Sequence, residues 1–430
     1  MKLQAIDSDV KYWVVRAGKG AKYFNHFQQN NIVALGHINS LTKSEGVIDS
    51  IEPEVLTSLF NDRNLKITSD TNIELISELS ELLPEDTTEL VTSNKALTSS
   101  AGHAEVLAQQ EPAELVESPT VTDAQITIVR ESANQIAAKV TQVSTFINTM
   151  NVGDIIITVN EKSVLLGTIT SEPYIEDQEV FAYGSSGRRL ERNLDYKLRR
   201  KVEWEPAKDR ASIPKPIKPS LNAHQSIFSI SDSNKELFSH WLYGMFLQDD
   251  SFYFSTKIKE QNKVSQFNLA EFQRAIQKLE LLADKIANED YDFKDDLIKS
   301  LEEQYILSGL NNDFTLTTKN AFMSPGNMWS EVTGSLKKRI VFAMLLGYLY
   351  GTTVEATQLA SLSPKQVEVI VASAQIMKSP GQGNFDLYKK GIDADLDKPV
   401  KSAKEVKPDK LEGKPKFNFP KVKEKGDTGV

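Results

Sequence analysis

Cysteine is absent from this sequence, and histidine occurs only five times. Without cysteine the chain can form neither disulfides nor thiolate metal sites, and it lacks a cysteine nucleophile. The histidines are scattered along the chain without the spacing of metal ligands. Because structural metal sites need clustered ligands, we expect neither a metal nor another cofactor.

Long apolar runs are absent as well. The longest run is IVFAMLLGYLYG at residues 340–351, about twelve residues against the roughly twenty that span a bilayer. It is interpreted as a buried core helix, with a helix that faces a partner or a membrane as the alternative. The first residues hold no apolar segment of signal-peptide length, so we expect a cytoplasmic protein without a membrane span.

Short catalytic motifs are missing too. The sequence contains no phosphate-binding GxxxxGKS or GxxxxGKT loop, no GxSxG nucleophile elbow and no HExxH zinc motif. The nearest imitation of a nuclease centre is Glu203, Glu205 and Lys208, but a proline interrupts this strand. Glu331 is isolated in the sequence. We therefore expect a protein that is not an enzyme, with a metal-dependent nuclease in residues 233–379 as the alternative.

The net charge of −9 hides an uneven distribution. Residues 43–125 contain seventeen acidic and four basic residues, a net charge of −13, so the rest of the chain carries +4. From about residue 60 to 125 the chain is rich in Ser, Thr and Glu and has no aromatic residue after Phe60. Such a composition predicts a disordered or loosely helical insertion. A solvated loop is the simpler interpretation, and an acidic arm that occupies a basic groove is the alternative.

Hydrophobic periodicity predicts an α+β protein of two domains. Residues 1–232 form the first domain, with strands at 12–16 and 31–36, a helix between them, a helix at 129–149, a hairpin at 154–171 and a strand that ends at Trp204. Residues 233–379 form a second, helix-rich α+β domain, with a strand pair at 252–259 and 263–269 before a long amphipathic helix. Residues 380–430 are rich in Lys and Pro and predict a flexible tail.

Three motifs of the first domain resemble a known family. WVVRAGKGA with NNIVALG, FINTMNVGDIIITV with LLGTI, and YKLRRKVEWE are similar to the PUA-superfamily, EVE-like N-terminal domain of modification-dependent restriction and antiphage proteins. The resemblance covers about residues 11–230 and requires that the acidic segment is an insertion. It implies a small β-barrel flanked by helices, with a flipped, often modified base in an aromatic pocket beside a basic groove. His37 stands where an aromatic residue commonly follows the second strand.

The turn between the first strand and the first helix is a candidate anion site. Arg16, Gly18, Lys19 and Gly20 place two cations and two glycines there. Glycines allow consecutive N–H groups to point at one anion, and a helix start adds positive potential. A tight turn without a ligand is the alternative interpretation.

A second candidate site is the basic segment at residues 186–201, which carries seven basic and two acidic residues. Its basic residues are Arg188, Arg189, Arg192, Lys197, Arg199, Arg200 and Lys201. Phosphate contacts dominate nucleic-acid affinity, and the predominance of arginine favours them over a merely solvated face. Trp13 and Trp204 are the candidate walls of a base-stacking pocket, with a place in the core as the alternative.

These features together predict non-enzymatic recognition of nucleic acid, with DNA favoured over RNA. From the resemblance we expect a modified base as the target and a role as the sensor of a bacterial antiphage system. The second domain is expected to bind a protein partner or to self-assemble into oligomers. A structural protein without nucleic-acid binding is the remaining alternative.

Overall fold

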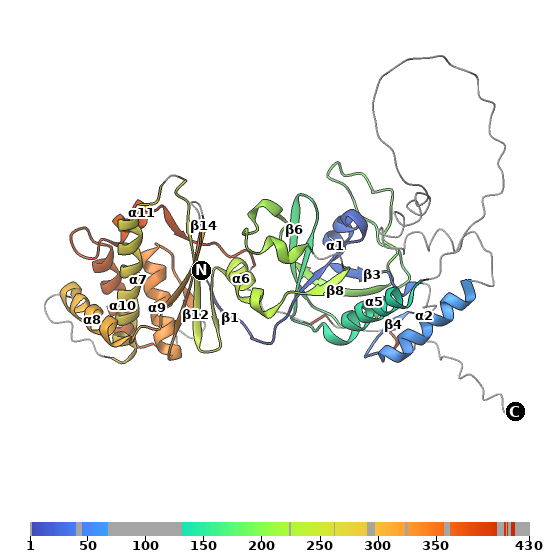
Figure 1. Ribbon diagram of the computed structural model, residues 1–430, viewed down its shortest axis with the longest axis horizontal. Helices are drawn as coiled ribbons and strands as arrows, with labels where there is room; N and C mark the ends of the chain where they lie inside the picture. The colour runs from blue at the N-terminus through green and yellow to red at the C-terminus, as the bar shows by residue number, and fades with distance from the viewer. Residues whose placement is uncertain are drawn as a thin grey trace, which may run out of the picture.

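The computed structural model describes residues 2–39, 45–67, 131–222, 225–261, 263–289, 297–322, 326–356, 362–401, 408–409, 411 and 414–417. They form two lobes side by side, each with its own β-sheet and hydrophobic core (Figure 1). The predicted mixed α+β fold is confirmed. Most of the predicted acidic insertion lies outside the described residues, and its first part belongs to helix α2 (Pro53–Ile67).

The described strands of the first lobe form a nine-stranded sheet in the order β10-β2-β5-β6-β8-β7-β4, with β3 beside β8 and β9 beside β6. Their bounds are β2 Tyr12–Val15, β3 Ile32–Leu35, β4 Gly46–Val47, β5 Ile155–Val159, β6 Ser163–Ile169, β7 Tyr174–Ile175, β8 Leu198–Trp204, β9 Lys208–Asp209 and β10 Ile227–Ser229. The helical elements of this lobe are η1 Lys19–Ala21, α1 Phe24–Asn30, α2, α5 Ala133–Ser144, the π-helical turn η3 Thr145–Thr149, η4 Arg210–Ser212 and η5 Lys218–Leu221. The helices and strands predicted for this lobe are confirmed, with α1 and α5 shorter than expected.

The central strands of this sheet are apolar without alternation because both faces are covered. Successive side chains of a strand point to opposite faces. Trp13 and Ile156 pack into the core beneath α1, α2 and α5, called here the first core. Their neighbours Tyr12 and Ile157 pack into a second layer on the other face, called here the central core. A strand buried on both faces reads as a continuous apolar run, which explains the sequence IIITV.

A closed barrel, which the resemblance implied, is not found among the described strands. The sheet is open, and its edge strand β4 pairs with the C-terminal segment instead of with β10. The amide of Val47 donates to the carbonyl of Pro415 at 2.8 Å, and the amide of Phe417 donates to the carbonyl of Val47 at 2.7 Å. The backbone groups of this edge therefore have partners without closure of the barrel.

The described strands of the second lobe form a seven-stranded sheet in the order β13-β14-β12-β11-β1-β15, with β16 beside β12. The bounds are β1 Lys2–Ala5, β11 Met245–Gln248, β12 Ser251–Ile258, β13 Thr317–Phe322, β14 Gly326–Thr333, β15 Glu355–Ala356 and β16 Ala394–Leu396. The helices are α6 Asp232–Tyr243, α7 Gln266–Ala287, α8 Leu297–Asn311, α9 Leu336–Leu349, α10 Pro364–Lys378 and α11 Phe385–Gly391. Figure 1 shows α7, α9 and α10 on one side of the sheet and α6 on the other.

The predicted pairing of residues 252–259 with 263–269 is wrong. The partners of β12 are β11, β14 and β16. Residues 263–269 instead lead into α7, whose N-cap Ser265 accepts a hydrogen bond from the amide of Asn268. The capping signal therefore overrides the local strand pattern. The apolar run at 340–351 forms most of α9, whose side chains from Ile340 to Leu346 are buried, so the core-helix interpretation is confirmed.

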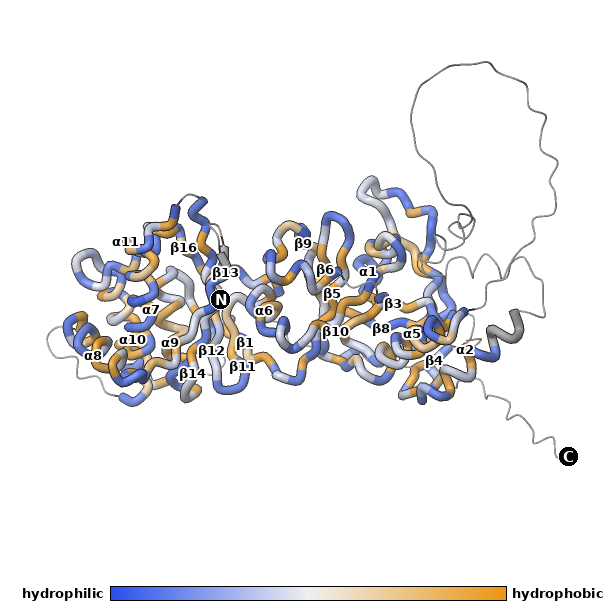
Figure 2. The backbone as a smooth tube through the Cα atoms, viewed as in Figure 1, coloured by the Kyte–Doolittle hydropathy of each residue, from blue (hydrophilic) through white to orange (hydrophobic). Residues whose placement is uncertain are grey.

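Helix α6 joins the two lobes. Phe238, Trp241 and Leu242 of this helix are buried in the central core against Tyr12 and Ile157 of the first sheet. On its other side, α6 contacts β11 and β12 of the second sheet. In the second lobe the strands lie on the side that faces α6, with α7, α9 and α10 beyond them (Figure 2). The lobes therefore share a continuous apolar interface.

The two ends of the chain lie elsewhere than the predicted domain limits placed them. Strand β1 lies in the second lobe, in parallel pairing with β11 and β15, although residues 1–232 were assigned to the first domain. Residues 385–396 form α11 and β16, and Phe417 is 7% exposed in the first core, although the segment after 380 was expected to be a flexible tail. Single apolar residues such as Phe385 and Phe417 hold this Lys- and Pro-rich segment on the two cores.

None of the described helices is both long enough and apolar enough to cross a membrane.

Candidate nucleic-acid interface

Arg200 lies inside the first lobe and not on a basic surface stripe. Its side chain is fully buried on β8. The guanidinium donates to the carbonyls of Phe146 at 2.9 Å, Ser171 at 3.1 Å, Ile147 at 3.1 Å and Met150 at 2.7 Å. Three of these carbonyls belong to η3 or its C-cap, where a cation also complements the helix dipole. Burial lowers the pKa of Arg200 to about 10. The predicted phosphate contact is corrected: Arg200 caps a helix end.

Arg199 is also interior, with 1% of its surface exposed. Its guanidinium donates to the carbonyls of Tyr196 and Gln178 at 2.7 and 2.5 Å and to a carboxylate oxygen of Glu176 at 3.1 Å. These contacts hold β8 to the segment that follows β7. A guanidinium with such partners is not available to a phosphate, so the prediction for Arg199 is corrected as well. Lys201 is half-buried on the same strand.

Trp13 is a core residue, as the alternative interpretation of its sequence position allowed. It is 4% exposed, and its indole N–H donates to Asp154 Oδ2 at 2.8 Å. Asp154 also accepts from the backbone amides of Lys11 and Asn151 at 3.0 and 2.9 Å. A pocket wall must expose a ring face to a base, and this ring is enclosed by the first core. The prediction that Trp13 walls a pocket is therefore corrected.

Trp204 is half-buried, and its indole N–H donates to the carbonyl of Phe27 at 2.8 Å. This bond holds the end of β8 against α1. Trp204 therefore contributes to the packing of the sheet against helix α1.

The Arg16–Gly20 turn is tight, and several of its carbonyls accept hydrogen bonds from the amides that follow it. Gly18 and Gly20 have φ of 74° and 60°, a region that favours glycine. The amides of Ala21, Lys22 and Tyr23 donate to carbonyls within the turn. Burial and the nearby Arg210 lower the pKa of the half-buried Arg16, which donates to the carbonyl of Leu221. Lys19 and Gly20 are exposed, and anion binding at this turn stays a prediction.

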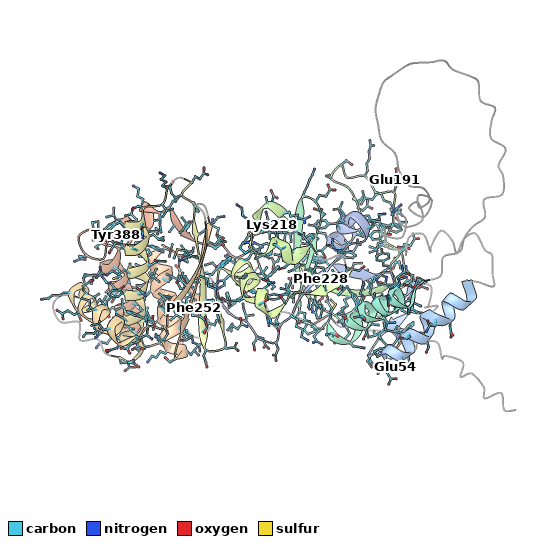
Figure 3. The ribbon with its side chains drawn as sticks, viewed as in Figure 1. Glu54, Glu191, Lys218, Phe228, Phe252 and Tyr388 are labelled. Atoms are coloured by element: carbon cyan, nitrogen blue, oxygen red, sulfur yellow. The ribbon has the colours of Figure 1, made fainter. Side chains whose placement is uncertain are left out.

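The exposed part of the basic segment lies on a hairpin of residues 180–194, called here the arginine hairpin. Val180 pairs with Leu194 and Tyr183 pairs with Arg189 in antiparallel bridges. The turn at its tip includes Gly187, whose φ is 74°. Arg188, Arg189 and Arg192 are all exposed. Figure 3 labels Glu191 on this projection, at the outer margin of the first lobe.

Two exposed aromatic residues on the same hairpin were missed by the sequence interpretation. Phe181 is 38% exposed and Tyr183 is 54% exposed. The guanidinium carbon of Arg189 lies 3.5 Å from the centre of the Phe181 ring, and its Nη2 donates to Asn193 at 3.1 Å. The signal was present in the sequence FAYGSSGRR, where two aromatic residues and two arginines flank a Gly-Ser turn. Exposed aromatic rings beside arginines are the parts from which single-strand binding surfaces are built.

Helix α1 holds the base of the arginine hairpin. Gln29 donates to the carbonyl of Tyr183 at 2.7 Å and accepts from its amide at 2.8 Å. Asn30 donates to the carbonyl of Phe181 at 2.8 Å. His26 Nε2 lies 2.9 Å from the carbonyl of Arg192 and donates this bond, because a carbonyl oxygen only accepts. Burial lowers the pKa of His26. The hairpin is therefore fixed to the first lobe along α1, through contacts that extend from His26 to Asn30.

The alternative of a metal-dependent nuclease concerns the acidic and histidine residues that the structure describes. No group of three or more Asp, Glu or His side chains that could hold a metal is found among them. Glu331 accepts hydrogen bonds from Ser251 at 2.6 Å and Tyr253 at 3.0 Å, and so serves the packing of β12 and β14. Glu280 pairs with Lys338 at 2.9 Å and accepts from the backbone and hydroxyl of Thr315.

Comparison of this chain with known protein families, with curated proteins and with solved structures finds no match.

Proposed function

We propose that this chain is a cytoplasmic, non-enzymatic nucleic-acid-binding protein, and that the arginine hairpin makes its main contact with single-stranded DNA. The observation that carries the proposal is the combination of exposed Phe181 and Tyr183 with exposed Arg188, Arg189 and Arg192 on one fixed hairpin. A merely solvated charged face explains the arginines but not the exposed aromatic rings.

Each group on the hairpin has a chemical part in this proposal. The arginines neutralise phosphates, which supplies affinity that falls as salt rises. The rings of Phe181 and Tyr183 stack on unpaired bases, a contribution of roughly 1–3 kcal/mol per base. Arg189 already stacks on Phe181 and so extends the flat surface that a base would meet.

The resemblance extends the proposal in two further ways. We propose that the first lobe is a PUA/EVE-like module despite its open sheet, and that it reads a modified base as the sensor of a bacterial antiphage system. With Trp13 in the core, the aromatic contact to such a base is assigned to Phe181 and Tyr183.

The test is a fluorescence-anisotropy titration of the full chain with labelled single-stranded DNA at several salt concentrations. The charge variant combines Arg188→Gln, Arg189→Gln and Arg192→Gln, and the stacking variant combines Phe181→Ala and Tyr183→Ala. The charge variant is expected to lower the slope of log affinity against log salt by about 2, since each single-strand phosphate contact contributes about 0.7.

A charge control combines Lys215→Gln and Lys218→Gln, two exposed cations elsewhere in the first lobe, and removes two positive charges where the charge variant removes three. This control is expected to leave both affinity and salt slope close to those of the parent. RNA and duplex DNA of the same sequence test the preference for single-stranded DNA. The proposal fails if the parent does not bind DNA at low salt, or if the hairpin variants bind as the control does.

A role of the second lobe in self-assembly stays a prediction. The observation that favours it is the exposure of Ile306, Leu307 and Leu310 on α8, at 54%, 60% and 79%. Clustered exposed apolar side chains are typical of surfaces that contact another protein.

A further inference from the structure

A cavity of about 220 Å³ lies in the second lobe between helix α7 and the face of strands β12, β13 and β14. Its floor includes the buried side chains of Phe254, Phe272 and Met328. Its rim includes Gln273 and Thr318, which are half-buried. The cavity therefore reaches from the core of the lobe towards solvent. At roughly 30 Å³ for each water molecule it has room for about seven, or for one small organic molecule.

Register places two hydroxyl groups side by side on the sheet wall of this cavity. Thr318 of β13 pairs with Ser330 of β14, and Ser330 in turn pairs with Phe254 of β12. Directly paired residues present their side chains on the same face of a sheet. The oxygens Oγ1 of Thr318 and Oγ of Ser330 lie 3.0 Å apart. A pair of hydroxyls thus stands next to an aromatic ring.

Helix α7 supplies two carboxamides to the opposite wall. Gln273 and Gln277 are four residues apart, so they share one face of the helix, and both line the cavity. The hydroxyl of Tyr305 donates to Oε1 of Gln277 at 3.1 Å, which sets the orientation of that amide. Phe272 and Ile276 of the same helix belong to the core of the lobe and also line the cavity. Hydrogen-bonding groups therefore face the cavity from both walls.

The lining determines the chemical class of molecule that fits. None of the lining residues that the structure describes carries a charge. A charged ligand would lose its hydration without gaining a counter-charge, which disfavours phosphates, carboxylates and amines. Hydroxyls and carboxamides both donate and accept hydrogen bonds, and the aromatic and aliphatic side chains favour a flat apolar body.

We propose that this cavity binds a small, uncharged, planar heterocycle with hydrogen-bond donors and acceptors on its edge, the chemistry of a free nucleobase. The site lies in the second lobe, away from the arginine hairpin, and the proposal does not depend on binding of nucleic-acid strands by the first lobe. It assigns to the second lobe the recognition of a small molecule.

Isothermal titration calorimetry on the full chain tests this site, with cytosine and adenine as probes. Indole, which has a single donor, and benzoate, which is charged, are the chemical controls. Cytosine or adenine is expected to bind, and benzoate is expected not to bind. Absence of binding by both nucleobases, or binding of benzoate with equal affinity, would overturn the proposal.

The matched variants are Thr318→Val and Thr317→Val. Both replace a hydroxyl with a methyl group on the same strand, but neighbouring side chains point to opposite faces, and only Thr318 lines the cavity. Thr318→Val is expected to weaken nucleobase binding about five- to tenfold through the loss of one hydrogen bond, whereas Thr317→Val leaves it unchanged. Gln273→Leu, on the opposite wall, is expected to weaken binding in the same way. Equal affinities for the parent and both cavity variants would refute the site.

A short dC oligonucleotide added to the cytosine complex tests whether the cavity binds a free base or a base that belongs to a strand. No displacement of cytosine supports the free ligand, and displacement overturns that assignment. The hairpin charge variant, titrated with cytosine in parallel, is expected to bind as the parent does. A loss of DNA binding in the hairpin charge variant is therefore distinguishable from an absence of cytosine binding at the cavity.

Discussion

Replacement of Arg200 by methionine separates the structural arginines of the basic segment from those proposed to bind DNA. Arg200→Met keeps an unbranched apolar stem of similar length and removes only the guanidinium. The four carbonyls that this group contacts, on Phe146, Ile147, Met150 and Ser171, then lose a donor inside the first lobe.

The magnitude follows from these four hydrogen bonds. At about 1 kcal/mol of net stabilisation for each bond, their loss costs about 4 kcal/mol. Removal of a buried charge offsets part of this loss, because burial already disfavours the charged form and lowers the pKa of Arg200 to about 10. We therefore expect the free energy of unfolding to fall by about 3 kcal/mol, a value typical of the loss of a buried network.

Urea unfolding followed by circular dichroism measures this change, with Arg188→Met as the matched control. Arg188 is exposed on the arginine hairpin, so its replacement is expected to change stability by less than about 0.5 kcal/mol while it weakens DNA binding. Arg200→Met is expected to show the reverse at temperatures where it is folded. If Arg200→Met unfolds within 1 kcal/mol of the parent, roughly the worth of a single bond, and loses DNA binding, the assignment of Arg200 to the interior is refuted.

Two further predictions concern buried side chains. Trp13→Phe removes the indole donor to Asp154 and is expected to lower the free energy of unfolding by about 1–2 kcal/mol in the same urea assay. DNA affinity is expected to be unchanged. A loss of base preference in this variant would instead support Trp13 as a wall of a base pocket. Burial, with a smaller effect of Lys319, lowers the pKa of His240 to about 3, and Glu236 at 3.9 Å does not offset this. In the unfolded state His240 binds a proton near pH 6.5. The contribution of the buried neutral ring to the stability of the fold is therefore complete above that pH and is lost as pH falls towards 3. Between pH 6.5 and 5 the parent is expected to lose about 2 kcal/mol more stability than His240→Gln, and equal losses in the two proteins would contradict this reasoning.

The sequence predicted the local elements well where the physical signal is local. The strand at Tyr12–Val15, the helix α7 and the apolar helix α9 were all expected from their apolar pattern. The failures arose where a long-range contact decided the outcome. β1 joins a sheet whose other strands lie more than two hundred residues later, and no periodicity in residues 2–5 indicates that choice.

The candidate site shows the same division. The sequence identified a basic segment but could not show which of its arginines are exposed and which are buried. Arg188 and Arg200 are the same residue type in similar surroundings along the chain. Tertiary structure places one on an exposed hairpin and the other under a helix end. Phe181 and Tyr183 were overlooked because exposure of an aromatic ring depends on what packs against it, and the sequence does not show this.

The sequence by itself determined the composition of the cores, the absence of cysteine chemistry, the uneven charge and most helices and strands. These properties depend on residue identity and on spacing within a few turns or one strand. Only the tertiary structure decided which cations are buried, which aromatic rings are exposed, where the C-terminal segment lies and that the second lobe holds a neutral cavity. Each of these depends on contacts between residues far apart in the chain, because burial sets whether a charged or aromatic side chain stabilises the fold or meets a ligand.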